Sequence, residues 1–249
     1  MTAAPWPFPL WIAHRGAGKL APENTLAAFR LGASFGHTAF ECDVKLSADG
    51  VPFLLHDDTL ERTTSGQGVA GERDWAELSR LDAGRWHSAA FAGEPIASLE
   101  AVAAFCTANG CLLDLEIKPS PGTDADTGRT VGQWVRRLWR GTPVLLSSFK
   151  PQALMGARET APELPRALLL DTLWPGRMEM AASLDCVAVI TNHTLMDAAL
   201  LAQVHAAGQR ALVYTVNDTA RARELIALGI DGIVTDAVDL FSPRSPSPS

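Results

Sequence analysis

The sequence predicts an α/β fold, a TIM (β/α)8 barrel with a small inserted subdomain after the second strand. Short apolar runs recur along the chain and alternate with amphipathic segments of helical period, as in βα units around a parallel sheet. Eight such runs match the eight strands of a barrel, and 249 residues are enough to build one. An open doubly wound sheet uses the same alternation, but the strand count and the polar strand ends favour the barrel.

The apolar runs and the segments between them locate the elements in order. The expected strands are Leu10–Ala13, Ala39–Val44, Cys111–Ile117, Val144–Ser148, Ala167–Leu170, Cys186–Ile190, Ala211–Thr215 and Gly232–Thr235. The helices predicted between them are Asn24–Phe35, Leu99–Ala108, Val131–Arg140, Pro151–Thr160, Arg177–Ser183, Met196–Ala207 and Thr219–Leu228. Several of them are followed by the glycine expected just past a helix C-terminus, namely Gly36, Gly110, Gly208 and Gly229.

A long segment interrupts this alternation between Val44 and Ser98, where a short βα loop is expected. Within this insertion, assigned to residues 46–98, Asp49-Gly50 predicts a turn into a short extra strand, Phe53–Leu55. The polar pair His56-Asp57 follows that strand directly. We therefore expect a single domain over residues 1–241, with the Ser/Pro-rich residues 242–249 forming a disordered tail.

Charge and composition exclude several classes of partner. The formal net charge is -7 and the chain has no basic stripe, which argues against a nucleic acid or an anionic membrane surface as the main partner. Neither a signal peptide nor an apolar run long enough to span a membrane is recognisable, so a soluble, cytoplasmic protein is expected. The four cysteines form no C-x-x-C pair and lie in apolar segments, which predicts buried reduced thiols.

Carboxylates gather at the ends of two predicted strands. Residues two apart share a face of a strand, so Glu41 points with Asp43, and Glu116 points with Lys118. Three carboxylates meeting at one barrel mouth repel one another unless a cation is present or some are protonated. All-oxygen ligands favour Mg²⁺, Ca²⁺ or Mn²⁺ over zinc, so Glu41, Asp43 and Glu116 are predicted metal ligands. Structural ion pairs, such as Glu116 with Lys118, are the alternative.

Two histidines follow apolar runs, and each stands directly beside an ionic residue. His14 precedes Arg15, and His56 precedes Asp57. A lone histidine at such a place is usually structural, but a pair fits a general acid and a general base, because imidazole titrates near neutral pH. The planar fork of Arg15 suits two phosphate oxygens, and Lys118 adds a point charge.

Weaker candidates stand at other predicted strand and helix ends. Asn24 is the expected cap of the first helix, and Glu23 beside it is either part of that helix start or a ligand for substrate hydroxyls. Asn192-His193 and the pair Tyr214 and Asn217 follow later strands and are expected to shape the pocket.

Several of these segments, in this order and spacing, resemble the glycerophosphodiester phosphodiesterases, especially the cytoplasmic bacterial form. The matching segments are His14-Arg15-Gly16, Pro22-Glu23-Asn24-Thr25, Glu41-Cys42-Asp43, Leu55-His56-Asp57-Asp58-Thr59-Leu60-Glu61-Arg62-Thr63, Leu115-Glu116-Ile117-Lys118 and Tyr214-Thr215-Val216-Asn217. Tyr214 is a departure, since many members of the wider family carry tryptophan there, and it concerns the shape of the pocket, not the chemistry.

The resemblance implies an activity and a role for each residue. It implies metal-dependent hydrolysis of glycerophosphodiesters, such as glycerophosphocholine and glycerophosphoethanolamine, to sn-glycerol 3-phosphate and an alcohol. One divalent cation, with Mg²⁺ preferred over Ca²⁺ or Mn²⁺, is implied at Glu41, Asp43 and Glu116. His14 and His56 are implied to act as the general acid and the general base. Arg15 and Lys118 are implied to bind phosphate, and Glu23 and Tyr214 are further candidates for substrate contact.

Two other functions stay open from the sequence. A lyase-type phospholipase on a similar barrel would stop at a cyclic phosphate. A non-catalytic barrel that binds phosphodiesters would be expected to lack at least one imidazole or carboxylate of the set, and all of them are present.

Overall fold

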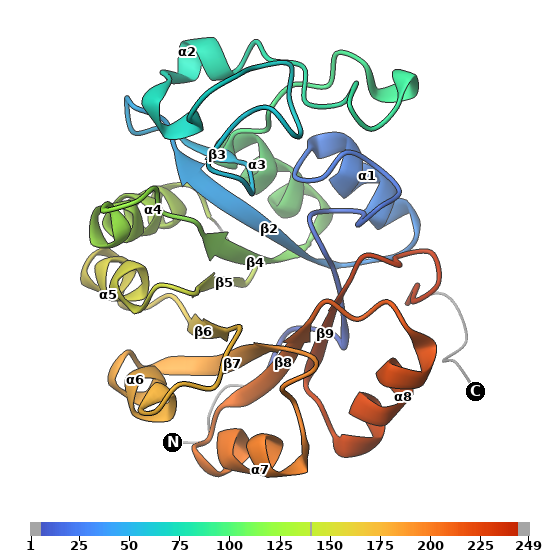
Figure 1. The fold of residues 1–249 in the computed structure, drawn as a ribbon, viewed down its shortest axis with the longest axis vertical. Coiled ribbons are helices and arrows are strands. Elements are labelled where there is room, and N and C mark those ends of the chain that lie inside the picture. The colour runs from blue at the N-terminus through green and yellow to red at the C-terminus, as the bar shows by residue number, and fades with distance from the viewer. Residues whose placement is uncertain (1–5, 140, 244–249) are drawn as a thin grey trace.

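The computed structural model describes residues 6–139 and 141–243, and eight parallel strands in it close into a barrel (Figure 1). β1 pairs in parallel with both β2 and β9, so the first strand closes the cylinder against the last. The barrel strands are β1 (Trp11–Ala13), β2 (Ala39–Leu46), β4 (Leu112–Ile117), β5 (Val144–Ser148), β6 (Arg166–Leu170), β7 (Cys186–Asn192), β8 (Arg210–Tyr214) and β9 (Gly232–Thr235). The predicted TIM barrel is confirmed.

A helix on the outside of the cylinder leads into each barrel strand after the first (Figure 1). These helices are α1 (Leu26–Ser34), α3 (Leu99–Asn109), α4 (Asp124–Leu138), α5 (Pro151–Thr160), α6 (Arg177–Ser183), α7 (Ala198–Ala206) and α8 (Thr219–Leu228). The four glycines predicted after helices all have positive φ, and Gly110 and Gly229 are left-handed C-caps.

The prediction for the start of α1 is wrong. Thr25, not Asn24, is the N-cap, and its side chain accepts a hydrogen bond from the Ala28 amide. Asn24 lies before the helix with φ of 59°. Its side chain is committed to Asp43 on β2, which leaves the cap to the next residue.

Helix α4 begins at Asp124, seven residues before the predicted start at Val131. Its first two turns carry no large apolar residue, because they pack through glycine. A Cβ on Gly128 would lie 1.9 Å from the Ala153 carbonyl oxygen of α5, and one on Gly156 of α5 would lie 2.0 Å from that of Ala125. The predicted end, Arg140, lies outside the described residues.

Side chains alternate between the barrel interior and the helix layer. Ile12, Leu145, Leu169, Ile190 and Val234 belong to one cluster that fills the barrel. The alternate residues of the barrel strands pack under the helices, as Cys42 of β2 and Leu113 and Leu115 of β4 do. A polar residue placed two positions after an interior apolar residue therefore points toward the C-terminal mouth of the barrel.

The insertion between β2 and α3 has a small core of its own, seen beside α1 and α3 in Figure 1. β3 (Pro52–Leu54) pairs antiparallel with β2 after a turn at Gly50, as predicted, and is followed by α2 (Trp75–Leu78) and 3-10 turns at Ala70–Glu72 and Ala89–Phe91. The cluster consists of Phe53, Leu55, Leu60, Ala70, Leu78, Ala83 and Ile96.

The predicted tail begins within the folded part of the protein. Ser242, the first residue of the predicted tail, is buried and donates a hydrogen bond to the Phe35 carbonyl, while residues 244–249 lie outside the described part.

All four cysteines fall within the described ranges and are buried free thiols. Among the described residues, no helix combines the length and apolar character needed to cross a bilayer.

Candidate active site

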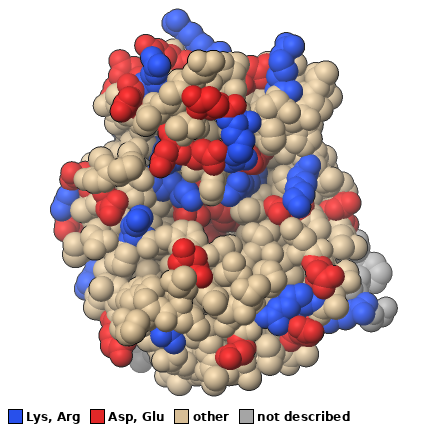
Figure 2. Space-filling model, in the orientation of Figure 1, with Lys and Arg blue, Asp and Glu red and all other residues tan. Residues whose placement is uncertain are grey.

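A cavity of about 210 Å³ opens at the C-terminal mouth of the barrel. Figure 2 shows a hollow near the middle of this face, where acidic and basic side chains gather. Its polar wall includes His14, Glu41 and Lys118, and its apolar wall includes Phe149 and Tyr214. These polar residues lie at the strand positions whose side chains point into the barrel, so they meet at its C-terminal mouth.

Three carboxylates form a buried cluster at the base of this cavity. Glu41 and Asp43 come from β2, and Glu116 from the adjacent β4, where it pairs in register with Asp43. One oxygen from each lies within 4.8 Å of the others, and the residues are only 6%, 1% and 8% exposed. Burial, together with repulsion from Asp43, raises the pKa of both glutamates. Ionising all three at once is therefore costly without a compensating cation.

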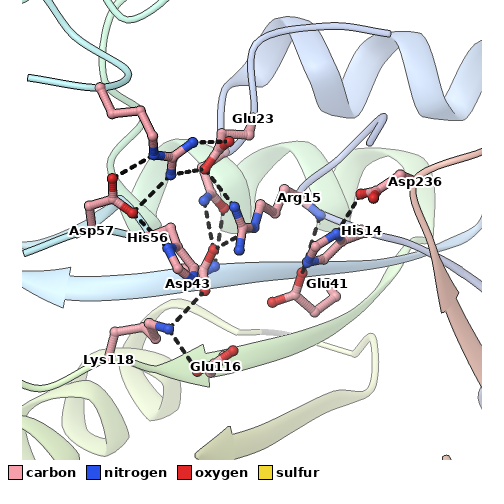
Figure 3. A network of polar contacts seen from close by, with 12 residues as sticks. His14, Arg15, Glu23, Glu41, Asp43, His56, Asp57, Glu116, Lys118 and Asp236 are labelled. Atoms are coloured by element: carbon pink, nitrogen blue, oxygen red, sulfur yellow. Dashed lines mark hydrogen bonds and ion pairs between the residues drawn. The ribbon is translucent and has the colours of Figure 1, made fainter. Parts of the chain in front are cut away.

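Two cations lie against this cluster (Figure 3). Arg15 Nε lies 3.2 Å from Asp43 Oδ2, and Arg15 Nη1 donates to Glu23 Oε1 at 2.7 Å. Lys118 Nζ lies 3.2 Å from Glu116 Oε1 and 3.8 Å from Asp43 Oδ1. Burial opposes the charge on Arg15 and Lys118, but the carboxylates outweigh it and raise both pKa values, so both stay cationic.

The two histidines each have one ring nitrogen against a carboxylate. His14 Nδ1 lies 2.6 Å from Asp236 Oδ1, and His56 Nδ1 lies 2.8 Å from Asp57 Oδ1. His14 Nε2 lies 3.7 Å from Glu41 Oε2. Burial lowers the pKa of His56 despite the opposing charge of Asp43, which favours a neutral imidazole able to accept a proton.

A family model, that of the glycerophosphoryl diester phosphodiesterases, matches residues 14–240, nearly the whole barrel and the insertion. The chain belongs to this phosphodiesterase family. The enzymatic class expected from the resemblance is thereby confirmed.

Relatives and solved structures agree with this family membership. The Bacillus subtilis protein YhdW is 34% identical over 235 residues, which are 92% of this chain and 95% of that protein. A Caldanaerobacter subterraneus glycerophosphodiester phosphodiesterase is 30% identical over 231 residues, with 91% and 93% covered. The structure of an Oleispira antarctica phosphodiesterase in complex with its product sn-glycerol 3-phosphate superimposes with a TM-score of 0.90 at 34% identity, covering 94% of this chain and 95% of that one.

The phosphodiesterase site brings the predicted residues into one place. His14, Arg15, Glu41, His56, Glu116, Lys118 and Tyr214 line the cavity. Tyr214 donates its hydroxyl hydrogen to the Leu170 carbonyl at 3.1 Å and packs edge-on against Phe149, so its ring has a fixed position on the apolar wall. Asp43 lies directly behind the cavity wall, in contact with Arg15.

Glu23 lies beside Arg15 rather than in the cavity lining, and arginines occupy most of its carboxylate. Its Oε1 accepts from Arg15 and from Arg62, and its Oε2 accepts from Arg62 at 2.8 Å. Arg62 also donates to both oxygens of Asp57, the partner of His56. Figure 3 shows this chain of contacts from the insertion to the barrel. An oxygen that accepts a single hydrogen bond, as Oε2 does, can still take a substrate hydroxyl.

Several residues of the site were not identified from sequence as part of it. Asp236 comes two positions after Val234, an interior residue of β9, just as His14 comes two positions after Ile12 of β1. This spacing could have predicted that Asp236 faces the barrel mouth. Arg62 had no such signal, because its partners are set by how the insertion packs. Asn24 was interpreted as a helix cap, although it contacts Asp43 twice.

The donor set fits the divalent cation that the family implies. Three carboxylates converge, and the buried oxygens Asp43 Oδ1 and Glu116 Oε1 face the ammonium of Lys118, at 3.8 and 3.2 Å. Oxygen donors of this kind suit a hard divalent ion. Glu41, Asp43 and Glu116 are therefore compatible with a metal site, with Lys118 and Arg15 balancing the remaining negative charge.

Proposed function

We propose that this phosphodiesterase hydrolyses glycerophosphodiesters derived from phospholipids, including glycerophosphocholine and glycerophosphoethanolamine, to sn-glycerol 3-phosphate and an alcohol. The observation that carries the proposal is the cavity in which two imidazoles, two cations and the carboxylate cluster converge. The similar Oleispira enzyme, which binds sn-glycerol 3-phosphate as its product, supports this substrate class. A cytoplasmic location remains a prediction from the sequence.

The cations bind the phosphate in this proposal, and the carboxylates hold one divalent ion, Mg²⁺ in preference to Ca²⁺ or Mn²⁺. Arg15 and Lys118 face the cavity and offer several N–H donors to phosphate oxygens. Glu41, Asp43 and Glu116 would hold the ion, whose positive charge stabilises negative charge that develops on the phosphate. Glu23 and Tyr214 contact the glycerol or the head group from the rim and the apolar wall.

The histidines transfer the protons. One of His14 and His56 removes a proton from the attacking oxygen, and the other donates a proton to the departing alkoxide. The attacking oxygen belongs either to water or to the 2-hydroxyl of the glycerol, which would form a cyclic phosphate that is then hydrolysed. Phosphorus NMR of the reaction identifies the route, and a cyclic ester that persists would make the enzyme a lyase.

A head-group panel tests the proposal. Release of glycerol 3-phosphate is measured from diesters of choline, ethanolamine, glycerol and inositol, with Mg²⁺, Mn²⁺ and Ca²⁺ in turn and after chelation. We expect His14→Ala and His56→Ala each to lower turnover by at least about a hundredfold. His205→Ala is the control, because His205 pairs with Asp231 at the opposite end of the barrel. Full turnover in both site variants, or no hydrolysis of any diester, would contradict the proposal.

A further inference from the structure

We propose that Asp236 is a positioning residue for His14 and that Asn217 fixes the orientation of Asp236, so that His14 presents Nε2 to the reaction. The proposal rests on the proposed role of His14 in proton transfer. Asp236 Oδ1 lies 2.6 Å from His14 Nδ1, although 222 positions separate the two residues. The other ring nitrogen faces the cavity, 3.7 Å from Glu41 Oε2.

The amide of Asn217 can have only one orientation. Its Oδ1 accepts hydrogen bonds from the Asp236 backbone N–H at 2.8 Å and from the Thr235 hydroxyl at 3.2 Å. Its Nδ2 therefore points away from that N–H and donates to Asp236 Oδ2 at 3.0 Å. Asn217 thus requires an acceptor at Oδ2 of residue 236.

Asp236 in turn determines which nitrogen of His14 carries a proton. Burial favours the neutral acid, but the hydrogen bonds from His14 and Asn217 outweigh it and lower the pKa of Asp236, which stays a carboxylate. A carboxylate only accepts hydrogen bonds, so Nδ1 of His14 must be the N–H donor. Nε2 is then the nitrogen that gains and loses the proton.

The backbone makes this arrangement rigid. β1 and β9 pair in register up to Ala13 and Thr235, and the His14 amide donates to the Thr235 carbonyl at 2.9 Å. His14 and Asp236 are therefore the next residues on two strands already locked together. His56 differs, because its carboxylate partner Asp57 is its neighbour in sequence and belongs to the same insertion.

Asp236→Asn tests the proposal with almost no change in shape. Asn217 donates toward residue 236, so the oxygen of the new amide turns to Asn217 and its NH₂ group turns to His14. Nδ1 must then accept, which moves the proton to Nε2. We expect kcat to fall by about 10²–10⁴-fold with little change in KM, the range seen when a histidine loses its orienting carboxylate.

An exchange variant separates positioning from general damage. In Asn217→Asp combined with Asp236→Asn, the new carboxylate at position 217 accepts from the backbone N–H, from Thr235 and from the new amide, whose oxygen again faces His14. We expect kcat at least about tenfold higher than in Asp236→Asn alone, because the Nδ1–H tautomer is restored. Asn217→Asp alone places two carboxylates together and should not show this gain.

Nitrogen-15 NMR of labelled histidine reads the tautomer without any activity assay. At alkaline pH we expect the Nδ1–H form of His14 in the wild type and in the exchange variant, and the Nε2–H form in Asp236→Asn. The Nε2–H form in the wild type, or an exchange variant no more active than Asp236→Asn, would overturn the proposal. If the tautomer changes as expected while kcat does not, Asp236 still positions the ring and it is the proposed proton transfer by His14 that fails.

Discussion

Arg62 of the insertion donates two hydrogen bonds of 2.8 Å to Glu23 of the loop after β1, 39 residues earlier in the chain. The same guanidinium holds Asp57, which in turn contacts His56. One side chain thus connects the insertion to the barrel beside a proposed catalytic histidine.

Replacing Arg62 with alanine should impair catalysis more than folding. The insertion keeps its own core, but Asp57 loses the guanidinium that connects it to Glu23, so the side chain of His56 is held less firmly, and a displacement of about 1 Å costs roughly 10²-fold in rate. We expect kcat/KM to fall by about 10–100-fold with a small change in Tm. Arg73→Ala is the control, since Arg73 is similarly exposed in the same insertion and forms a long ion pair with Glu77, at 3.7 Å. Equal activity of the two variants would mean that Arg62 has no positioning role.

Glu116→Gln should make the metal-free protein more stable while removing its response to Mg²⁺. Burial and repulsion from Asp43 raise the pKa of Glu116 to about 8, so the stability of the fold falls as the pH rises from the unfolded pKa toward that value, and a neutral amide removes the penalty. Thermal unfolding with EDTA and with Mg²⁺ measures both effects. Glu100→Gln on the exposed face of α3 is the matched control. An Mg²⁺-induced rise in Tm that survives Glu116→Gln would remove Glu116 from the ligand set.

Two substitutions of Asn24 should separate its hydrogen bonds from its backbone conformation. Both Asn24→Ala and Asn24→Gly lose the bonds to Asp43, which costs about 1–3 kcal/mol for buried groups left unpaired. Only alanine also pays about 1–2 kcal/mol for positive φ. Urea unfolding should therefore rank wild type above Asn24→Gly and Asn24→Ala lowest. If glycine were the less stable of the two, the assignment of strain at this position would be wrong.

Asp231→Asn should lower stability at neutral pH and lose that effect in acid. Burial opposes the charge of Asp231, but hydrogen bonds from the Ala211 amide, His205 and Arg210 outweigh it and lower its pKa. A lowered pKa stabilises the fold above the unfolded value of about 3.9, and the stabilisation disappears as the pH falls through the folded pKa. Denaturant unfolding measures the free energy of unfolding of both proteins at pH 7 and at acidic pH. The difference between wild type and Asp231→Asn should shrink once the pH falls below about 4. Asp185→Asn, at an exposed pair with Arg158, should change little at neutral pH.

The barrel could be predicted from sequence because its signal is local. Each strand is a short apolar run, and a period of two assigns Glu41 and Asp43 to one side and Cys42 to the other, as observed. The start of α4 was missed because its buried face is glycine, which carries no apolar signal although it permits close packing of α5.

The contacts that complete the site could not be predicted in the same way. Arg62 reaches Glu23 and Asp57 only after the insertion has packed over the barrel rim, and no spacing encodes that packing. Asn24 has the residue type and position of a helix cap, and only the tertiary contact with Asp43 decides against it. The local sequence pattern identifies the side chains at the end of a strand, but not the side chains from other segments that contact them.

Because β1 pairs with β9, the barrel can close only after the last strand has been synthesised. His14 leaves the ribosome well before its partner Asp236 and the strand β9, because 222 positions separate the two residues. A chain that stops before β9 can fold several βα units and still leave the ring of His14 without its carboxylate. Full activity should therefore appear only when the cylinder closes, after β9 has paired with β1.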